Sequence, residues 1–86
     1  MKVFKDMCEE AKIERISLEA KAQKEYLHGL LETEYENFEK SLEHLYASKG
    51  ILSGLLETVG TIEKAHISEK ITHIDSYIRQ CKFKLN

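Results

Sequence analysis

The fold class is decided by one stretch near the C-terminal end of the chain, residues 67–85, which reads ISEKITHIDSYIRQCKFKL. Its apolar side chains recur at alternating intervals of four and three residues, the spacing of one face of an α-helix. The members of this stripe are Ile67, Ile71, Ile74, Ile78, Cys81 and Leu85. The chain contains no proline, so no helix is forced to end at one. The stretch therefore predicts a long amphipathic helix.

Three further stripes with the same spacing precede it. They are Ile13, Ile16, Ala20, Gln23 and Leu27, then His28, Leu31, Tyr35, Phe38, Leu42 and Leu45, and then Leu52, Leu55, Val59, Ile62 and His66. The register slips by one residue after position 27 and again after position 66. Because helical spacing continues almost end to end, the predicted fold class is all-α.

The most credible turn is Ala47-Ser48-Lys49-Gly50, because glycine suits the left-handed position after a helix and lysine suits the last helical turn. Gly29 is a weaker candidate, at which a first helix either kinks or breaks. The prediction is a single helical domain over residues 1–86. Two long helices, about 3–47 and 52–84, form an antiparallel hairpin that a second copy or a partner completes to a bundle.

Length and composition favour assembly with another chain. A chain of 86 residues buries only about 60–65% of its unfolded surface, and this one lacks tryptophan. Cys8 and Cys81 are predicted to be free thiols, because the start of the sequence does not resemble a secretory signal. No apolar run approaches membrane-spanning length, so we expect a cytoplasmic protein that does not contact a membrane.

The net charge of −2 argues against nucleic acid as a partner. The charge is nevertheless uneven along the chain. Acidic residues gather over positions 32–43 as Glu32, Glu34, Glu36, Glu39 and Glu43, and basic residues gather over positions 79–84 as Arg79, Lys82 and Lys84. These runs are either solvated helix faces or regions that steer a partner or a second copy.

Two faces opposite the apolar stripes are candidate partner-binding surfaces. On the first helix the candidates are Met7, Ala11, Leu18 and Ala22, and on the second they are Thr58, Thr61, Ala65, Ser68, Thr72 and Ser76. Small uncharged side chains let another helix approach closely. The alternative is a solvent-exposed face that lacks charge.

A cluster of glutamate and histidine residues is the candidate metal site. Two Glu-x-x-His motifs, at positions 25–28 and 63–66, have the spacing of di-iron carboxylate bundles. A hairpin folded near position 49 would bring position 32 opposite 66, and 25 opposite 73. The cluster comprises Glu25, His28, Glu32, Glu63, His66 and His73. The alternative is a polar layer that sets the helix register and weakens at acidic pH.

These patterns favour a non-enzymatic protein-interaction module, such as a homodimeric chaperone, inhibitor, antitoxin or adaptor. No catalytic or cofactor-binding residues are predicted. The alternative is a metal-binding helical bundle. An RNA-binding hairpin dimer ranks last, since it needs a basic face and the N-terminal basic residues are scattered among glutamates. Those basic residues are Lys2, Lys5, Lys12, Arg15 and Lys24.

Overall fold

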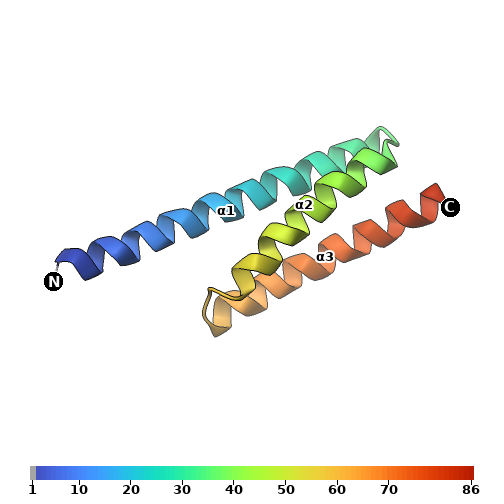
Figure 1. Ribbon diagram of the computed structural model, residues 1–86. Coiled ribbons are helices and arrows are strands. Elements are labelled where there is room, and N and C mark those ends of the chain that lie inside the picture. Colours follow the sequence, from blue (N-terminus) through green and yellow to red (C-terminus); the bar gives the residue numbers. More distant parts are fainter. Residues whose placement is uncertain (1) are drawn as a thin grey trace.

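A computed structural model describes the backbone of residues 2–86 and the side chains of residues 13–86. Within this part of the chain lie three α-helices: α1 (Lys2–Glu34), α2 (Phe38–Leu56) and α3 (Thr61–Leu85). Figure 1 shows α2 running back along α1 and α3 running back along α2, with the N-terminal part of α1 extending beyond the other two helices. The all-α prediction is confirmed.

The chain turns at positions that differ from the predicted ones. The residues between helices are 35–37 and 57–60, so α2 is a separate helix of 19 residues. Ser48 and Gly50 lie inside α2, and Gly29 lies inside α1. The predicted turn at residues 47–50 is therefore wrong, and so are the two helix ranges built on it. A third helix, which the hairpin prediction left to a partner, comes from the same chain.

The turn between α1 and α2 is closed by a left-handed residue that is not glycine. Glu36 has φ of 61°. The Glu36 N–H donates to the Thr33 carbonyl at 3.0 Å, and the Asn37 N–H donates to the Glu32 carbonyl at 2.8 Å. These two bonds form the Schellman arrangement that satisfies the last carbonyl groups of a helix. Because no glycine stands here, the sequence pattern did not reveal the turn.

The turn before α3 uses a glycine in an extended conformation. Gly60 precedes the helix with φ −76° and ψ 177°. Its N–H donates to the Glu63 carboxylate at 2.9 Å, and its carbonyl accepts from the Lys64 N–H at 2.9 Å. The carboxylate thus satisfies a backbone donor at the helix start, where a negative charge also favours the helix dipole.

The core confirms most of the predicted stripe on α3 but not the one on α1. Its buried apolar residues are Ala22, Leu45, Leu52, Leu55, Ile67, Ile74, Ile78 and Cys81. On α1, the exposed fractions of Ile13, Ile16 and Leu27 are 62%, 61% and 52%. The α1 stripe of Ile13, Ile16 and Leu27 therefore faces away from the core.

Small residues explain this rotation of α1. The Ser48 hydroxyl donates to the Ala22 carbonyl at 2.7 Å, and the Ser41 hydroxyl donates to the Gly29 carbonyl at 2.8 Å. Both serines are fully buried. A buried hydroxyl needs such a partner, and backbone carbonyls are reachable only where the facing helix carries small side chains. The face of α1 that packs against α2 is therefore the one that carries Ala22 and Gly29.

No helix within residues 2–86 combines the length and the apolarity needed to cross a membrane.

Candidate nucleic-acid interface

The basic side chains of α3 all lie on the surface. They are Lys64, Lys70, Arg79, Lys82 and Lys84. The acidic residues of the same helix are Glu63, Glu69 and Asp75. Basic residues outnumber acidic ones in α3, whereas the reverse holds in α1.

Two of the three acidic groups of α3 are neutralised by other helices. The Asp75 carboxylate lies 2.7 Å from the Lys49 ammonium of α2, and the Glu63 carboxylate lies 3.7 Å from the Arg15 guanidinium of α1. Glu63 also caps its own helix through Gly60. The basic side chains of α3 take no part in the ion pairs found among residues 13–86, so their charge is available to an anionic partner.

The C-terminal part of α3 combines positive charge with an aromatic surface. Phe83 is 80% exposed, and it stands four residues after Arg79, so these two side chains are neighbours on the helix surface. The Lys82 ammonium lies 5.6 Å from the centre of the Tyr46 ring of α2. We call Arg79, Lys82 and Phe83, which stand at i, i+3 and i+4 on the helix, the C-terminal basic face.

A cavity of about 140 Å³ opens where all three helices meet. It is lined by Glu19, Ala22, Gln23 and Tyr26 of α1, Ser48 and Leu52 of α2, and Lys70, His73 and Ile74 of α3. The rings of Tyr26 and Tyr77 meet edge to face next to it, with centroids 6.0 Å apart. Burial, and then the neighbouring Tyr77 hydroxyl, raises the pKa of Tyr26, so its hydroxyl is neutral.

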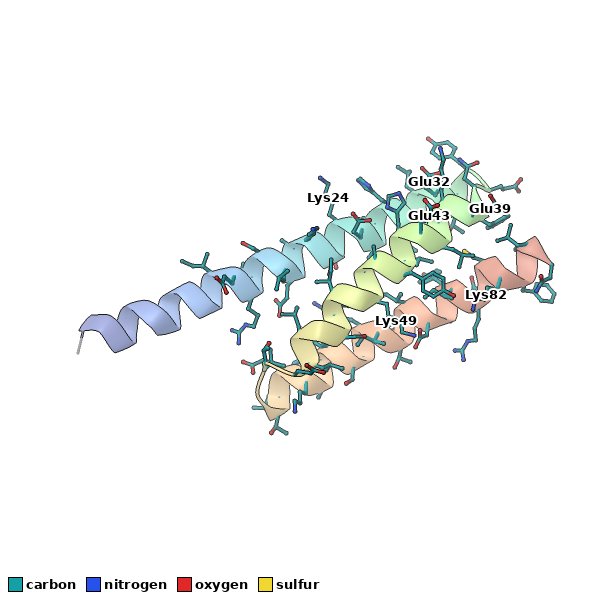
Figure 2. All side chains as sticks on the ribbon, in the orientation of Figure 1. Lys24, Glu32, Glu39, Glu43, Lys49 and Lys82 are labelled. Carbon is teal, nitrogen blue, oxygen red and sulfur yellow. The ribbon has the colours of Figure 1, made fainter. Side chains whose placement is uncertain are left out.

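The turn between α1 and α2 carries the opposite charge. Figure 2 shows Glu32, Glu39 and Glu43 together at the end where α1 gives way to α2, while Lys82 lies on α3. Farther along α1, the His44 ring donates to the Glu25 carboxylate at 2.7 Å. This hydrogen bond lowers the pKa of Glu25. Phosphate groups would be repelled from the turn itself, which lies at the same end of the bundle as the C-terminal part of α3, since the Cys81 thiol is 3.4 Å from the Ser41 hydroxyl.

The predicted metal cluster is dispersed. Glu25 bonds to His44, whose ring also meets the His28 ring edge to face at 5.3 Å between centroids. Glu63 caps α3, and His66 and His73 are exposed on that helix. Among the described side chains, no three His, Cys, Asp or Glu groups come close enough to hold a metal ion. The hairpin prediction placed residues of α1 opposite residues of α3 in two antiparallel helices. That pairing is wrong because α2 comes between them in the chain, so α1 and α3 run in the same direction (Figure 1).

The candidate partner-binding residues do not form one surface. Ala22 lies in the core with 1% exposure, and Leu18 is 42% exposed. The others on α3 and before it are exposed or half-buried on the surface: Thr58, Thr61, Ala65, Ser68, Thr72 and Ser76. Met7 and Ala11 lie outside the residues whose side chains are described.

Comparison with known proteins points to a nucleic acid. A family described as SRP68, RNA-binding signal recognition particle 68, matches residues 2–86. None of the curated proteins and none of the solved structures matches the sequence. The family's description names RNA binding, in line with the expectation that the chain is not an enzyme.

This match corrects the functional predictions. Neither a chaperone, inhibitor or adaptor module nor a metal-binding bundle agrees with it, and the exclusion of nucleic acid from the net charge was wrong. A net charge averages over the whole surface, whereas a binding partner meets one face at a time. The basic charge of α3 is offset in that average by the acidic residues around positions 32–43. Since the match covers nearly its full length, the chain belongs to the SRP68 family of RNA-binding signal recognition particle proteins.

Proposed function

We propose that this chain binds RNA as a component of a signal recognition particle in the cytoplasm, and that the C-terminal basic face of α3 makes the principal contact. The observation that carries the assignment of the surface is the exposed Phe83 ring beside Arg79 and Lys82 on α3. The family match supports RNA as the partner.

Charge supplies the affinity of such a surface. Lysine and arginine side chains displace condensed cations from the phosphate backbone, and the released ions favour binding at low salt. Arginine can also form two parallel hydrogen bonds with one phosphate. Arg79 and Lys82 lie three residues apart on one face of α3, so they can contact neighbouring phosphates.

The aromatic ring gives the surface a second mode of contact. Unpaired bases stack on exposed aromatic side chains, an interaction that tolerates every base. Phe83 is almost fully open to solvent, and Tyr46 offers a second ring under Lys82. We infer that RNA presents an unpaired or distorted region here, because bases stacked in a regular helix are not free to stack on a side chain.

The acidic residues at the α1–α2 turn determine the direction in which the RNA crosses the protein surface. Glu32, Glu39 and Glu43 gather at the α1–α2 turn (Figure 2), and like charges oppose the approach of phosphate. The RNA therefore extends away from the α1–α2 turn along α3. Lys70, about 21 Å from Lys84 along the helix axis, lies on the same side of α3 as Lys84, about half a turn around the helix from Arg79.

A binding titration tests the proposal. Fluorescence anisotropy would compare labelled signal recognition particle RNA with an unrelated structured RNA of equal length. We expect tighter binding to the former, with affinity falling steeply as salt rises. The double variant Arg79→Gln, Lys82→Gln should lower the magnitude of the salt slope by about 1.5.

Lys40→Gln is the matched control, since Lys40 is an exposed lysine of α2 close in sequence to Glu39 and Glu43. It should leave the affinity and the slope within error of the unchanged protein. Equal losses in the control and the double variant would refute the assignment to α3, and a protein that binds neither RNA at low salt would refute the proposed function.

A further inference from the structure

We propose that the cavity between the three helices holds a single unpaired cytosine base of the bound RNA. This inference rests on the proposed RNA binding and assigns a base-specific subsite to it, separate from the C-terminal basic face.

Its size suits one small ring. The cavity measures about 140 Å³, close to the roughly 150 Å³ of an engineered protein cavity that takes up benzene. Ala22, Leu52 and Ile74, all buried, provide an apolar floor. Tyr26 lines the same space and offers an aromatic surface against which a base can pack.

The polar lining discriminates between the pyrimidines. Glu19 contributes a carboxylate, which only accepts hydrogen bonds when ionised, and Gln23 contributes an amide that both donates and accepts. Cytosine presents an amino group that a carboxylate accepts. Uracil presents a carbonyl oxygen at the same place, which the carboxylate repels. The amide of Gln23 can donate to the remaining acceptors of cytosine.

Lys70 can bind the phosphate group attached to the bound base. Lys70 lines the cavity and is exposed on α3, so its ammonium can reach a phosphate outside the cavity. His73 lies one helical turn farther along the same lining. A free base would gain nothing from Lys70, whereas a nucleotide within a strand would, so the arrangement favours RNA as the source of the base.

Short oligonucleotides test the base preference. The whole chain would be titrated at low salt with labelled single-stranded hexamers of cytidine, uridine and adenosine. We expect the cytidine hexamer to bind about fivefold more tightly than the uridine hexamer. Glu19→Gln should bring the two affinities within about twofold, because an amide can donate to the uracil carbonyl. Glu14→Gln removes the same charge from an exposed position of α1 that does not line the cavity, and it should preserve the preference.

A spectroscopic readout locates the base. Addition of cytidine 5′-monophosphate should shift the NMR signals of the Tyr26 ring and the Ile74 methyl groups, with smaller shifts for uridine 5′-monophosphate. Circular dichroism would confirm that Glu19→Gln keeps the helicity and melting temperature of the unchanged protein.

The failures of the two proposals are distinguishable. Equal binding of all three hexamers, together with normal binding of signal recognition particle RNA, would overturn the cavity assignment and leave the proposed function intact. Loss of binding to every RNA would overturn both. Nucleotide shifts confined to Phe83 and its neighbours would also overturn the cavity assignment.

Discussion

A methyl carbon of Leu45 lies only 2.9 Å from the point where a β-carbon on Gly29 would stand. Leu45 is fully buried in α2, so α1 and α2 approach each other as closely as they do because position 29 has no side chain. The serine hydroxyls that donate to the carbonyls of Ala22 and Gly29 depend on the same close approach. The spacing of these helices therefore depends on a glycine in the middle of a helix.

The first prediction concerns this glycine. Gly29→Ala should lower the free energy of unfolding by about 1 kcal/mol, because overpacking costs about 1–3 kcal/mol and the gain in helix propensity returns up to about 1 kcal/mol. Gly50→Ala should raise it by about 0.5–1 kcal/mol, since nothing lies within 4 Å of a β-carbon there. Urea denaturation of both variants measures the contrast. Stabilisation by both substitutions would show that the helices are not in close contact at Gly29.

A second prediction tests the turn between α1 and α2. Glu36→Gly should raise the free energy of unfolding by about 0.5–1 kcal/mol, because glycine adopts the observed positive φ without the steric penalty of a β-carbon. Glu34→Gly, within the last turn of α1, should lower it by about 0.5–1 kcal/mol. Thermal unfolding would compare the two, and a loss of stability in Glu36→Gly would place the turn elsewhere.

Sequence periodicity predicted α3 better than α1, for a physical reason. The α3 stripe contains its largest apolar residues, and four of them, Ile67, Ile74, Ile78 and Cys81, are buried. On α1 the largest apolar residues lie outside, because close packing against α2 requires small residues at Ala22 and Gly29. A stripe of large apolar residues therefore predicts the buried face of a helix that packs through large side chains, as α3 does. It fails for a helix that packs through small ones, as α1 does.

The candidate interface was only partly visible in the sequence. The sequence shows the basic run at positions 79–84, where it predicts a solvated helix face or a region that steers a partner or a second copy. Two features that favour RNA binding could be identified only from the three-dimensional structure. Lys49 of α2 neutralises Asp75 of α3, and residues of all three helices line the cavity. Neither contact follows from spacing along the chain.

The third prediction concerns acid stability. The hydrogen bond from His44 lowers the pKa of Glu25 below its ordinary value of 4.5. A carboxyl group with a lowered pKa in the folded state stabilises the fold fully above pH 4.5, and the contribution is lost as the pH falls through the lowered pKa. Glu25→Gln should therefore be less stable than the unchanged protein near pH 6, by about 1 kcal/mol at most for such a partly exposed pair.

Urea denaturation from pH 6 to pH 3 would show the difference shrinking as the solution becomes more acidic. Glu43→Gln, at an exposed position of α2, serves as the control. A difference between Glu25→Gln and the unchanged protein that stays constant over this range would mean that the pKa of Glu25 is not lowered in the folded state.

A fourth prediction separates stacking from charge. Phe83→Ser should weaken binding of single-stranded RNA by about 1–3 kcal/mol, the usual contribution of one stacked base. It should leave the melting temperature almost unchanged, because the ring is 80% exposed. Tyr35→Ser removes a ring that is 70% exposed at the acidic α1–α2 turn. If this control weakened RNA binding as much as Phe83→Ser, the interface would not be confined to α3.

The most direct test of the account is a map of the protein surface that RNA covers. NMR spectra of the isotope-labelled chain would be recorded with and without signal recognition particle RNA, followed by solvent-exchange measurements on the complex. The account predicts that signals from Lys70, Arg79, Lys82 and Phe83 shift and become protected, while those around Glu39 and Glu43 do not change. Protection centred on the α1–α2 turn, with α3 unaffected, would contradict it.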